Sequence, residues 1–238
     1  MCGIYLSCER FQNRHPPPDV VSELKCRGPD DLQTKELLPS QNGLSCYLNI
    51  VSSVLSLRGE SIVNQPVVDD SDASDCFLLW NGEAWKYNQT PLNGSDTRFI
   101  FDCLLGAAKN TWLSKAPETA ATQAIVSVLS KIYGPFAFVF YDAFHQSLYY
   151  GRDILGRRSL LIHSPSVDSI ELSSIAGEVQ SDRFVEVKSD GIYMLDLASG
   201  GKAQKDTSAS VTQMTPQRIP WKVSTDTCNQ DVTLVRQK

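Results

Sequence analysis

Short apolar runs, most of them rich in β-branched and aromatic residues, follow one another along the first 197 residues of the chain. Glycine, proline, aspartate or asparagine separates each run from the next, which is typical of strands. We predict strands within residues 3–8, 46–57, 75–80, 136–142, 147–151, 159–163 and 192–197.

Two longer segments have helical spacing. The first helix is predicted over residues 97–109, with Ser95 or Asp96 as its N-cap. The second is predicted over residues 118–133, because apolar residues recur there at i, i+3, i+4 and i+7 and Gly134 supplies a stop. Two helices among many strands, without alternation of strand and helix, indicate an α+β fold with antiparallel sheets.

The composition changes after about Leu197. Residues 198–238 are rich in Ser, Thr, Gln, Lys and Gly, with few apolar residues and no clear periodicity. We therefore predict one domain over residues 2–197 and a polar tail or linker over residues 198–238.

Charge and cysteine content exclude several kinds of partner. A net charge of -5 provides no broad basic surface for nucleic-acid phosphates or anionic lipids. No run approaches the roughly 18 apolar residues of a membrane span. The seven cysteines are scattered and form no C-x-x-C pair, which argues against a zinc site and a disulfide framework. We expect no metal site, no nucleic-acid or membrane partner, and a reducing, cytoplasmic location.

The strongest candidate for chemistry is Cys2, in the opening MCGIYLSC. A free cysteine is most often a small buried apolar side chain. Removal of Met1, however, would give Cys2 an α-amine with an ordinary pKa of roughly 7.7–8.0, suited to a general base. A thiol and an amine on one residue make a nucleophile with its own base. Gly3 would permit close approach of substrate or backbone.

Seven motifs occur in a familiar order: MCGIYLSC, CRGPDD, LSLRGESIVNQPV, LLWNGEAW, GSDTRFIF, YGPFAFVFYD and YYGRDILGRRSLL. Together they resemble the glutaminase domain of class II glutamine amidotransferases, most closely that of the asparagine synthetase family. The resemblance covers roughly residues 2–197. It implies an N-terminal nucleophile hydrolase fold, a four-layer αββα sandwich in which two antiparallel sheets face each other with helices outside.

The resemblance also implies catalytic roles. Cys2 matches the nucleophile that attacks the side-chain amide of L-glutamine. Asn81 and Gly82 match the oxyanion hole, in which a side-chain N–H and a backbone N–H face the developing negative oxygen. Such a donor is typically worth about 10²–10³ in rate.

Substrate-binding roles follow in the same way. Arg58 matches the arginine that pairs with the α-carboxylate of glutamine, a task that suits a planar guanidinium. Asn81, Glu83 and Asp96 match residues of the glutamine pocket, where Asp96 accepts from the α-ammonium group.

Each assignment has a structural alternative. Asn-Gly is a common hairpin turn, Arg58 could end a surface strand, and Asp96 could cap the following helix. The joint occurrence of these features favours the catalytic interpretation, because they fall where the Cys2 hypothesis needs donors, a carboxylate clamp and an ammonium acceptor.

Two arginine-containing motifs are interpreted as structural. In CRGPDD, Cys26 stands where the family usually has histidine, and residues 27–30 are expected to shape a loop over the nucleophile. In GRDILG, Arg152 and Asp153 are expected to form a strand end and turn with an internal ion pair.

The resemblance implies hydrolysis of glutamine to glutamate and ammonia, without metal or organic cofactor. In the family, ammonia passes to a synthetase domain that uses ATP and magnesium and carries an S-G-G-x-D-S loop. SGGK at residues 199–202 lacks the rest of that motif, so we expect the synthetase domain to be absent from this chain.

Two alternatives stay open. One is a catalytically inactive glutaminase-like interaction module, favoured by the substituted histidine and the missing synthetase motif. The other is a class II transferase that delivers ammonia to a sugar phosphate or phosphoribosyl acceptor.

Overall fold

A computed structural model describes residues 1–38, 45–69, 71, 74–177, 182–198 and 214–221 of the protein. The first large sheet has the strand order β13-β11-β12-β1-β3-β2. Its strands are β1 (Gly3–Glu9), β2 (Asp31–Leu37), β3 (Tyr47–Val54), β11 (Leu161–Ser166), β12 (Ser169–Ser173) and β13 (Val185–Glu186).

The second large sheet has the order β15-β14-β10-β9-β5-β4. It is formed by β4 (Val67–Val68), β5 (Phe77–Gly82), β9 (Phe136–Asp142), β10 (Ser147–Arg152), β14 (Ile192–Asp196) and β15 (Gln217–Ile219). A small third sheet, in the order β7-β6-β8, contains β6 (Lys86–Tyr87), β7 (Thr90–Pro91) and β8 (Ile132–Tyr133). The named strands pair antiparallel, as the sequence predicted.

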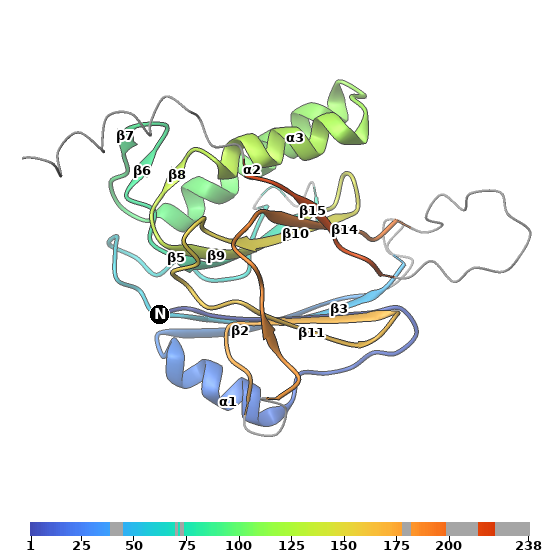
Figure 1. Ribbon diagram of the computed structural model, residues 1–238. Coiled ribbons are helices and arrows are strands. Elements are labelled where there is room, and N and C mark those ends of the chain that lie inside the picture. The colour runs from blue at the N-terminus through green and yellow to red at the C-terminus, as the bar shows by residue number, and fades with distance from the viewer. Residues whose placement is uncertain (39–44, 70, 72–73, 178–181, 199–213, 222–238) are drawn as a thin grey trace, which may run out of the picture.

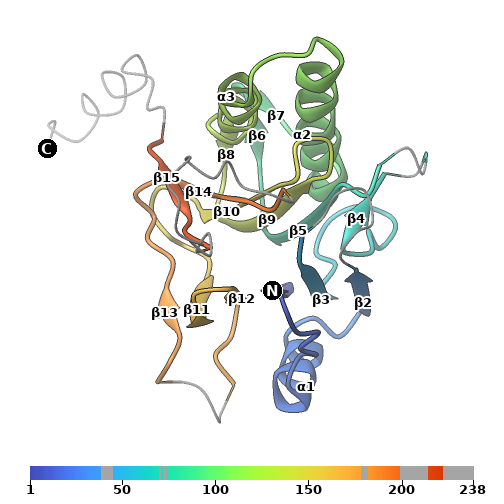
Figure 2. The same ribbon diagram turned by 90° about the vertical axis from the view of Figure 1, so that its right-hand side faces the viewer.

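Four layers result, because the two large sheets face each other and carry helices outside (Figure 1). Helices α2 (Asp96–Leu113) and α3 (Glu118–Leu129) lie together over the second sheet, and α1 (Pro18–Arg27) lies on the first (Figure 2). The predicted four-layer αββα sandwich is confirmed. Among the described helices, none combines the length and the apolar character needed to cross a membrane.

Alternation along the strands creates the core between the sheets. Ile4, Leu6 and Cys8 point from β1 into a cluster that also contains Phe77 and Leu79 of β5. The intervening Trp80 points to the other face of β5, where it packs with α2 and α3. Successive strand residues face opposite sides, so each strand of this pair supplies one row of side chains to the inter-sheet core.

The structure corrects several predicted boundaries. The first predicted helix continues to Leu113, and the second ends at Leu129, after which Ile132–Tyr133 forms strand β8. Several elements were not predicted from the sequence. They include α1, a helix of 10 residues, the largely polar edge strand β2, and the short strands β4, β6, β7, β12, β13 and β15. Short or polar elements carry a weak hydrophobic pattern, which explains why they were missed.

The prediction of a polar tail from residue 198 is wrong for residues 214–221. Met214 is buried in the inter-sheet core, and β15 pairs with β14 at the edge of the second sheet. Trp221 donates from its indole nitrogen to the carbonyl oxygen of Ser189 at 3.0 Å. The remainder of the predicted tail lies outside the described residues.

Gly134, which precedes β9, has no room for a side chain. A Cβ there would lie 2.1 Å from the carbonyl oxygen of Glu83, and its φ is +151°. We expect Gly134→Ala to lower the free energy of unfolding by about 2–4 kcal/mol, measured by urea denaturation. Gly106→Ala is the matched control, because Gly106 lies in α2 with no atom within 4 Å of the added Cβ and should gain helix stability. Equal effects of the two substitutions would contradict the expectation.

Candidate active site

The start of β1 and the end of β5 meet at one edge of the sandwich. Cys2 precedes Ile4 by two residues, and Asn81 follows Leu79 by two, so both continue rows that face the inter-sheet core. Beyond the apolar part of that core, both line one cavity, which has about 600 Å³ of empty space, part of it open to solvent. The alternation of side chains along the strands therefore directs the thiol of Cys2 and the amide of Asn81 into one cavity from two different sheets.

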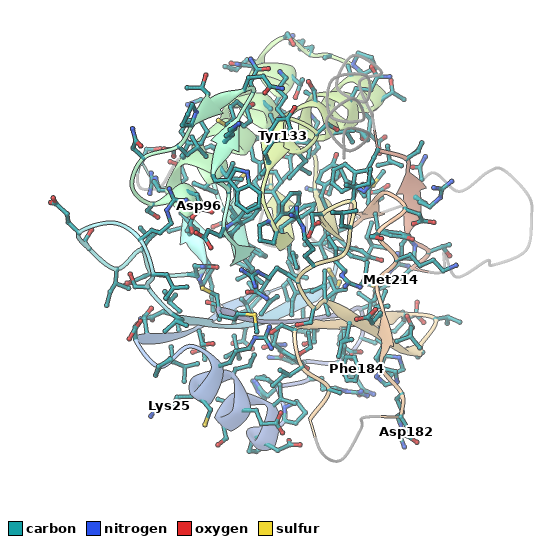
Figure 3. The ribbon with its side chains drawn as sticks, turned by 60° about the vertical axis from the view of Figure 1, so that its left-hand side comes forward. Lys25, Asp96, Tyr133, Asp182, Phe184 and Met214 are labelled. Carbon is teal, nitrogen blue, oxygen red and sulfur yellow. The ribbon has the colours of Figure 1, made fainter. Side chains whose placement is uncertain are left out.

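The structure brings all six predicted site residues to this cavity. Its lining includes Cys2, Arg58, Asn81, Gly82, Glu83 and Asp96, together with Met1, Gln65 and Arg158. In Figure 3, Asp96 lies on the opposite side of the view from Met214, the first described residue of the returning segment 214–221.

Cys2 is half-buried, and its Sγ lies 3.8 Å from the carbonyl oxygen of Leu55. Burial raises the pKa of its thiol above the ordinary value. The thiol is therefore the resting form, and formation of a thiolate needs a base. Met1 lines the same cavity, and its α-amine lies 3.5 Å from the carbonyl oxygen of Arg27.

Asn81 is 1% exposed, yet its Nδ2 has no hydrogen-bond partner within the described part of the chain. A buried amide nitrogen without an acceptor is costly, and such groups occur where a site awaits a ligand. Asn81 lies inside β5, opposite Ala137 of β9. The alternative of a hairpin turn at Asn81-Gly82 is thereby excluded.

The backbone N–H of Gly82 points away from β9. Glu83 donates to the carbonyl oxygen of Pro135 beside β9, whereas both backbone groups of Trp80 bind the side chain of Gln65 on the other side. Because backbone direction alternates along a strand, Gly82 shares the direction of Trp80, toward Gln65 and the cavity. A Cβ on Gly82 would lie 2.7 Å from the Cβ of Phe136, so only glycine fits there.

Asp96 is the first residue of α2, and Ser95 is its N-cap. Its Oδ2 accepts from the backbone N–H of Ala84 at 2.6 Å and from the indole nitrogen of Trp80 at 3.1 Å. The carboxylate thus binds groups outside its own helix, contrary to the capping alternative. Burial raises the pKa of Asp96, and this outweighs the opposing effects of its hydrogen bonds and of Arg58.

A pH-dependent effect on stability follows from this burial. Below pH 3.8, the reference pKa of an aspartate, Asp96 is protonated in both the folded and the unfolded chain. As pH rises, Asp96 loses its proton first in the unfolded chain. The folded chain therefore loses stability relative to the unfolded chain. Asp96→Asn removes this contribution. We expect the unfolding free energy of the natural chain, relative to that of the variant, to fall as pH rises above 3.8, in denaturation series at several pH values. A constant or rising difference would contradict it.

Arg58 reaches the same corner from the loop after β3. Its Nη1 donates to the carbonyl oxygen of Ala84 at 2.9 Å, and its Nη2 to that of Leu92 at 2.7 Å. Ala84 therefore connects Arg58 and Asp96 through its carbonyl and its N–H. A guanidinium has five N–H groups, so these two bonds leave further donors for a ligand. Glu83 lines the cavity directly after the Asn81-Gly82 pair.

Gln65 is a site residue that the sequence prediction missed. It is 1% exposed and fixes β5 by two bonds to Trp80, donating to its carbonyl oxygen at 2.9 Å and accepting from its N–H at 2.6 Å. The bonds orient the strand that carries Asn81 and Gly82. Gln65 stands inside the motif LSLRGESIVNQPV, but only the tertiary contact shows what it does.

The two arginine motifs have the structural roles predicted for them. Arg27 donates from Nε to the carbonyl oxygen of Cys2 at 3.1 Å, and Asp30 accepts from the N–H of Ser56 at 2.7 Å, so this loop holds the chain around Cys2. The predicted internal ion pair is corrected. Arg152 pairs with Glu186 at 3.1 Å, and Asp153 with Arg157 at 2.9 Å.

Over the described ranges, no three His, Cys, Asp or Glu side chains form a group that could hold a metal ion. The site is instead built from one thiol, amide and backbone N–H groups, a guanidinium and carboxylates. These groups suit acyl transfer through a covalent intermediate, with a zwitterionic ligand bound between Arg58 and Asp96.

Known proteins of two kinds are similar to this chain. No family model matches it. It is 34% identical over 227 residues to asparagine synthetase domain-containing protein 1 of Bos taurus, a match that covers 94% of this chain and 31% of the relative. The human protein of that name is 32% identical over 201 residues, covering 83% of this chain and 28% of the relative. The chain thus spans less than a third of the length of these relatives.

Two solved structures share the fold. A glutamine phosphoribosylpyrophosphate amidotransferase from B. subtilis, complexed with ADP and GMP, has a TM-score of 0.54 at 14% identity, covering 91% of this chain and 49% of that one. A second structure, described as the allosteric regulatory enzyme of purine biosynthesis, has a TM-score of 0.58 at 13% identity and covers 91% of this chain and 48% of that one. The chain therefore belongs to the family of asparagine synthetase domain-containing protein 1, as a domain with the N-terminal nucleophile hydrolase fold of class II glutamine amidotransferases.

Proposed function

We propose that this domain hydrolyses L-glutamine to glutamate and ammonia, with Cys2 as the nucleophile in the chain from which Met1 has been removed. One observation carries the proposal. The buried Nδ2 of Asn81 has no partner among the described residues and lines the same cavity as Cys2, where an oxyanion formed on attack by sulfur would accept from it.

In the proposed mechanism, Arg58 and Asp96 bind the two charged groups on the α-carbon of glutamine. Arg58 pairs with the α-carboxylate of glutamine, and Asp96 accepts from its α-ammonium group, with Glu83 beside them. Arg58 and Asp96 lie near each other because Arg58 donates to the carbonyl oxygen of Ala84 and Asp96 accepts from its N–H. The side chain of glutamine then extends toward Cys2 and Asn81.

The reaction begins when the α-amine of Cys2 takes the thiol proton and sulfur attacks the amide carbon. Burial raises the pKa of this thiol, so a base is needed, and an α-amine has a suitable pKa. Asn81 and Gly82 donate to the oxyanion. The ammonium form of the amine protonates the departing nitrogen, ammonia leaves, and water hydrolyses the thioester to release glutamate.

We further propose that the ammonia serves asparagine formation by a synthetase domain, because the relatives are named for an asparagine synthetase domain. ATP and magnesium belong to that domain, and glutamine hydrolysis itself needs no metal or organic cofactor. The proposed partners of this domain are therefore L-glutamine and a synthetase domain that receives ammonia.

The test is release of glutamate and ammonia from glutamine by purified chain whose intact mass shows that Met1 is absent. We expect equal amounts of both products, and we expect the rate to saturate as the glutamine concentration rises. Chain that retains Met1 is the internal control and should be inactive, because its α-amine is displaced by one residue from Cys2. No turnover by folded, processed chain, alone or with a synthetase domain added, would instead support the inactive interaction module.

A further inference from the structure

Two guanidinium groups converge on the amino end of the chain. Nη1 of Arg158 lies 3.4 Å from Sδ of Met1, and Nη2 of Arg27 lies 3.8 Å from the same sulfur. Arg158 also lines the cavity that contains Cys2. It belongs to the loop between β10 and β11.

Neighbouring residues fix the backbone of Arg158. Buried Arg152 donates from Nε to the carbonyl oxygen of Arg158 at 2.7 Å. Ser159 donates to the carbonyl oxygen of Ser174 at 2.9 Å and accepts from Nη2 of Arg27 at 3.0 Å. The position of Arg158 is thus determined by contacts that do not involve its own guanidinium.

The guanidinium of Arg158 makes few contacts that could stabilise the fold. Its Nε is buried and has no hydrogen-bond partner among the residues that the structure describes. Its contact with Met1 disappears when Met1 is removed. A half-buried cation whose buried Nε has no structural partner, at the edge of a candidate site, indicates an electrostatic role there.

The charged groups around the amino end come from several elements. Arg27 at the end of α1 and Arg158 disfavour a positive charge there, whereas the Cys2 thiol and Asp30 favour it when ionised. Burial lowers the pKa of the Met1 α-amine, and both arginines lower it further. The rest of the cavity carries three more charged side chains, those of Arg58, Glu83 and Asp96.

We propose that Arg158 is a positioning residue for the α-amine of Cys2: in the processed chain, its guanidinium and that of Arg27 face the amine and favour its neutral form. Only the neutral amine can take the thiol proton, so the role matters most at acidic pH. Arg27 stays close because its Nε binds the carbonyl oxygen of Cys2. The inference rests on the proposed function, in which this amine is the base.

The test compares the pH dependence of kcat/KM for glutamine in processed natural chain, Arg158→Gln, Arg158→Met and Arg158→Lys. We expect both neutral variants to move the acidic limb to higher pH, with about a fivefold to tenfold loss below the limb and little change on the alkaline plateau. Arg158→Lys keeps the charge and should restore most of the natural profile. Arg218→Gln is the charge-matched control, because Arg218 lies on β15, at the far edge of the second sheet from β5.

A second measurement does not depend on turnover. The pKa of the Cys2 α-amine can be followed by NMR titration of processed chain labelled with ¹⁵N-cysteine, and it should be higher in Arg158→Gln and Arg158→Met. Parallel pH profiles, or an unchanged amine pKa in folded variants, would overturn the inference. If no chain hydrolyses glutamine, the proposed function fails, and the amine titration still decides whether Arg158 acts on this group.

Discussion

Replacing Cys2 by Ala is expected to reduce glutamine hydrolysis on the order of 10⁴-fold or more, because the substitution removes the atom that forms the thioester in the proposed mechanism. The α-amine, the oxyanion donors and the pocket remain, so glutamine should still bind. Initial rates of glutamate release measure the first effect, and calorimetric titration with glutamine measures the second. Within the described part of the chain, Sγ of Cys2 makes one hydrogen-bond contact, to Leu55, so thermal stability should change little.

Cys26→Ser is the matched control for this substitution. Cys26 is exposed and does not line the cavity, although it lies in the neighbouring CRGPDD motif. Its replacement is expected to leave turnover within about twofold of the natural rate, as is usual for exposed positions away from a site. Retention of turnover in Cys2→Ala would remove Cys2 from the mechanism. Loss of turnover in both variants would show that the substitutions reduce activity by disturbing the fold.

Asn81→Ala is expected to lower kcat about 10²–10³-fold, with a smaller change in KM, because in the proposed mechanism its amide N–H donates mainly to the oxyanion of the transition state. Asn81→Asp should lose at least as much, since a carboxylate would repel that oxyanion. Steady-state kinetics over a range of glutamine concentrations separates the two parameters. The free energy of unfolding should stay within about 1 kcal/mol for Asn81→Ala, because Nδ2 has no partner among the described residues.

Asn49→Ala is the control, because it should lower stability and leave kcat unchanged. Asn49 is also a buried strand asparagine, but its Nδ2 donates to Asn13 at 2.8 Å, and it lies on β3 away from the cavity. We expect this variant to lose stability by about 1 kcal/mol or more and to keep its kcat. If Asn81→Ala were destabilised like Asn49→Ala while keeping its kcat, the oxyanion role would be wrong.

The candidate site could be predicted in part because its residues belong to recognisable motifs, but their physical arrangement could not. Asn81-Gly82 is compatible with both a turn and a strand end, and strand pairing with β9 decides between them. Asp96 is compatible with a cap, and only its bonds to Trp80 and Ala84 assign it to the cavity wall. Gln65 binds the backbone of Trp80, and Arg158 lies beside the distant amino end of the chain, and such contacts leave no local signature in the sequence.

The sequence by itself determined the strand-rich α+β class, because the period of two that buries a row of side chains is written in the order of residues. It also predicted which residues belong to the candidate site, namely Cys2 and the residues of the motifs around Asn81 and Asp96, and these line one cavity. The tertiary structure alone decided the returning strand β15, the polar edge strand β2, and the meeting of Cys2 with Asn81 at one end of the sandwich. These features depend on contacts between residues far apart in the chain, where packing between sheets outweighs local preference.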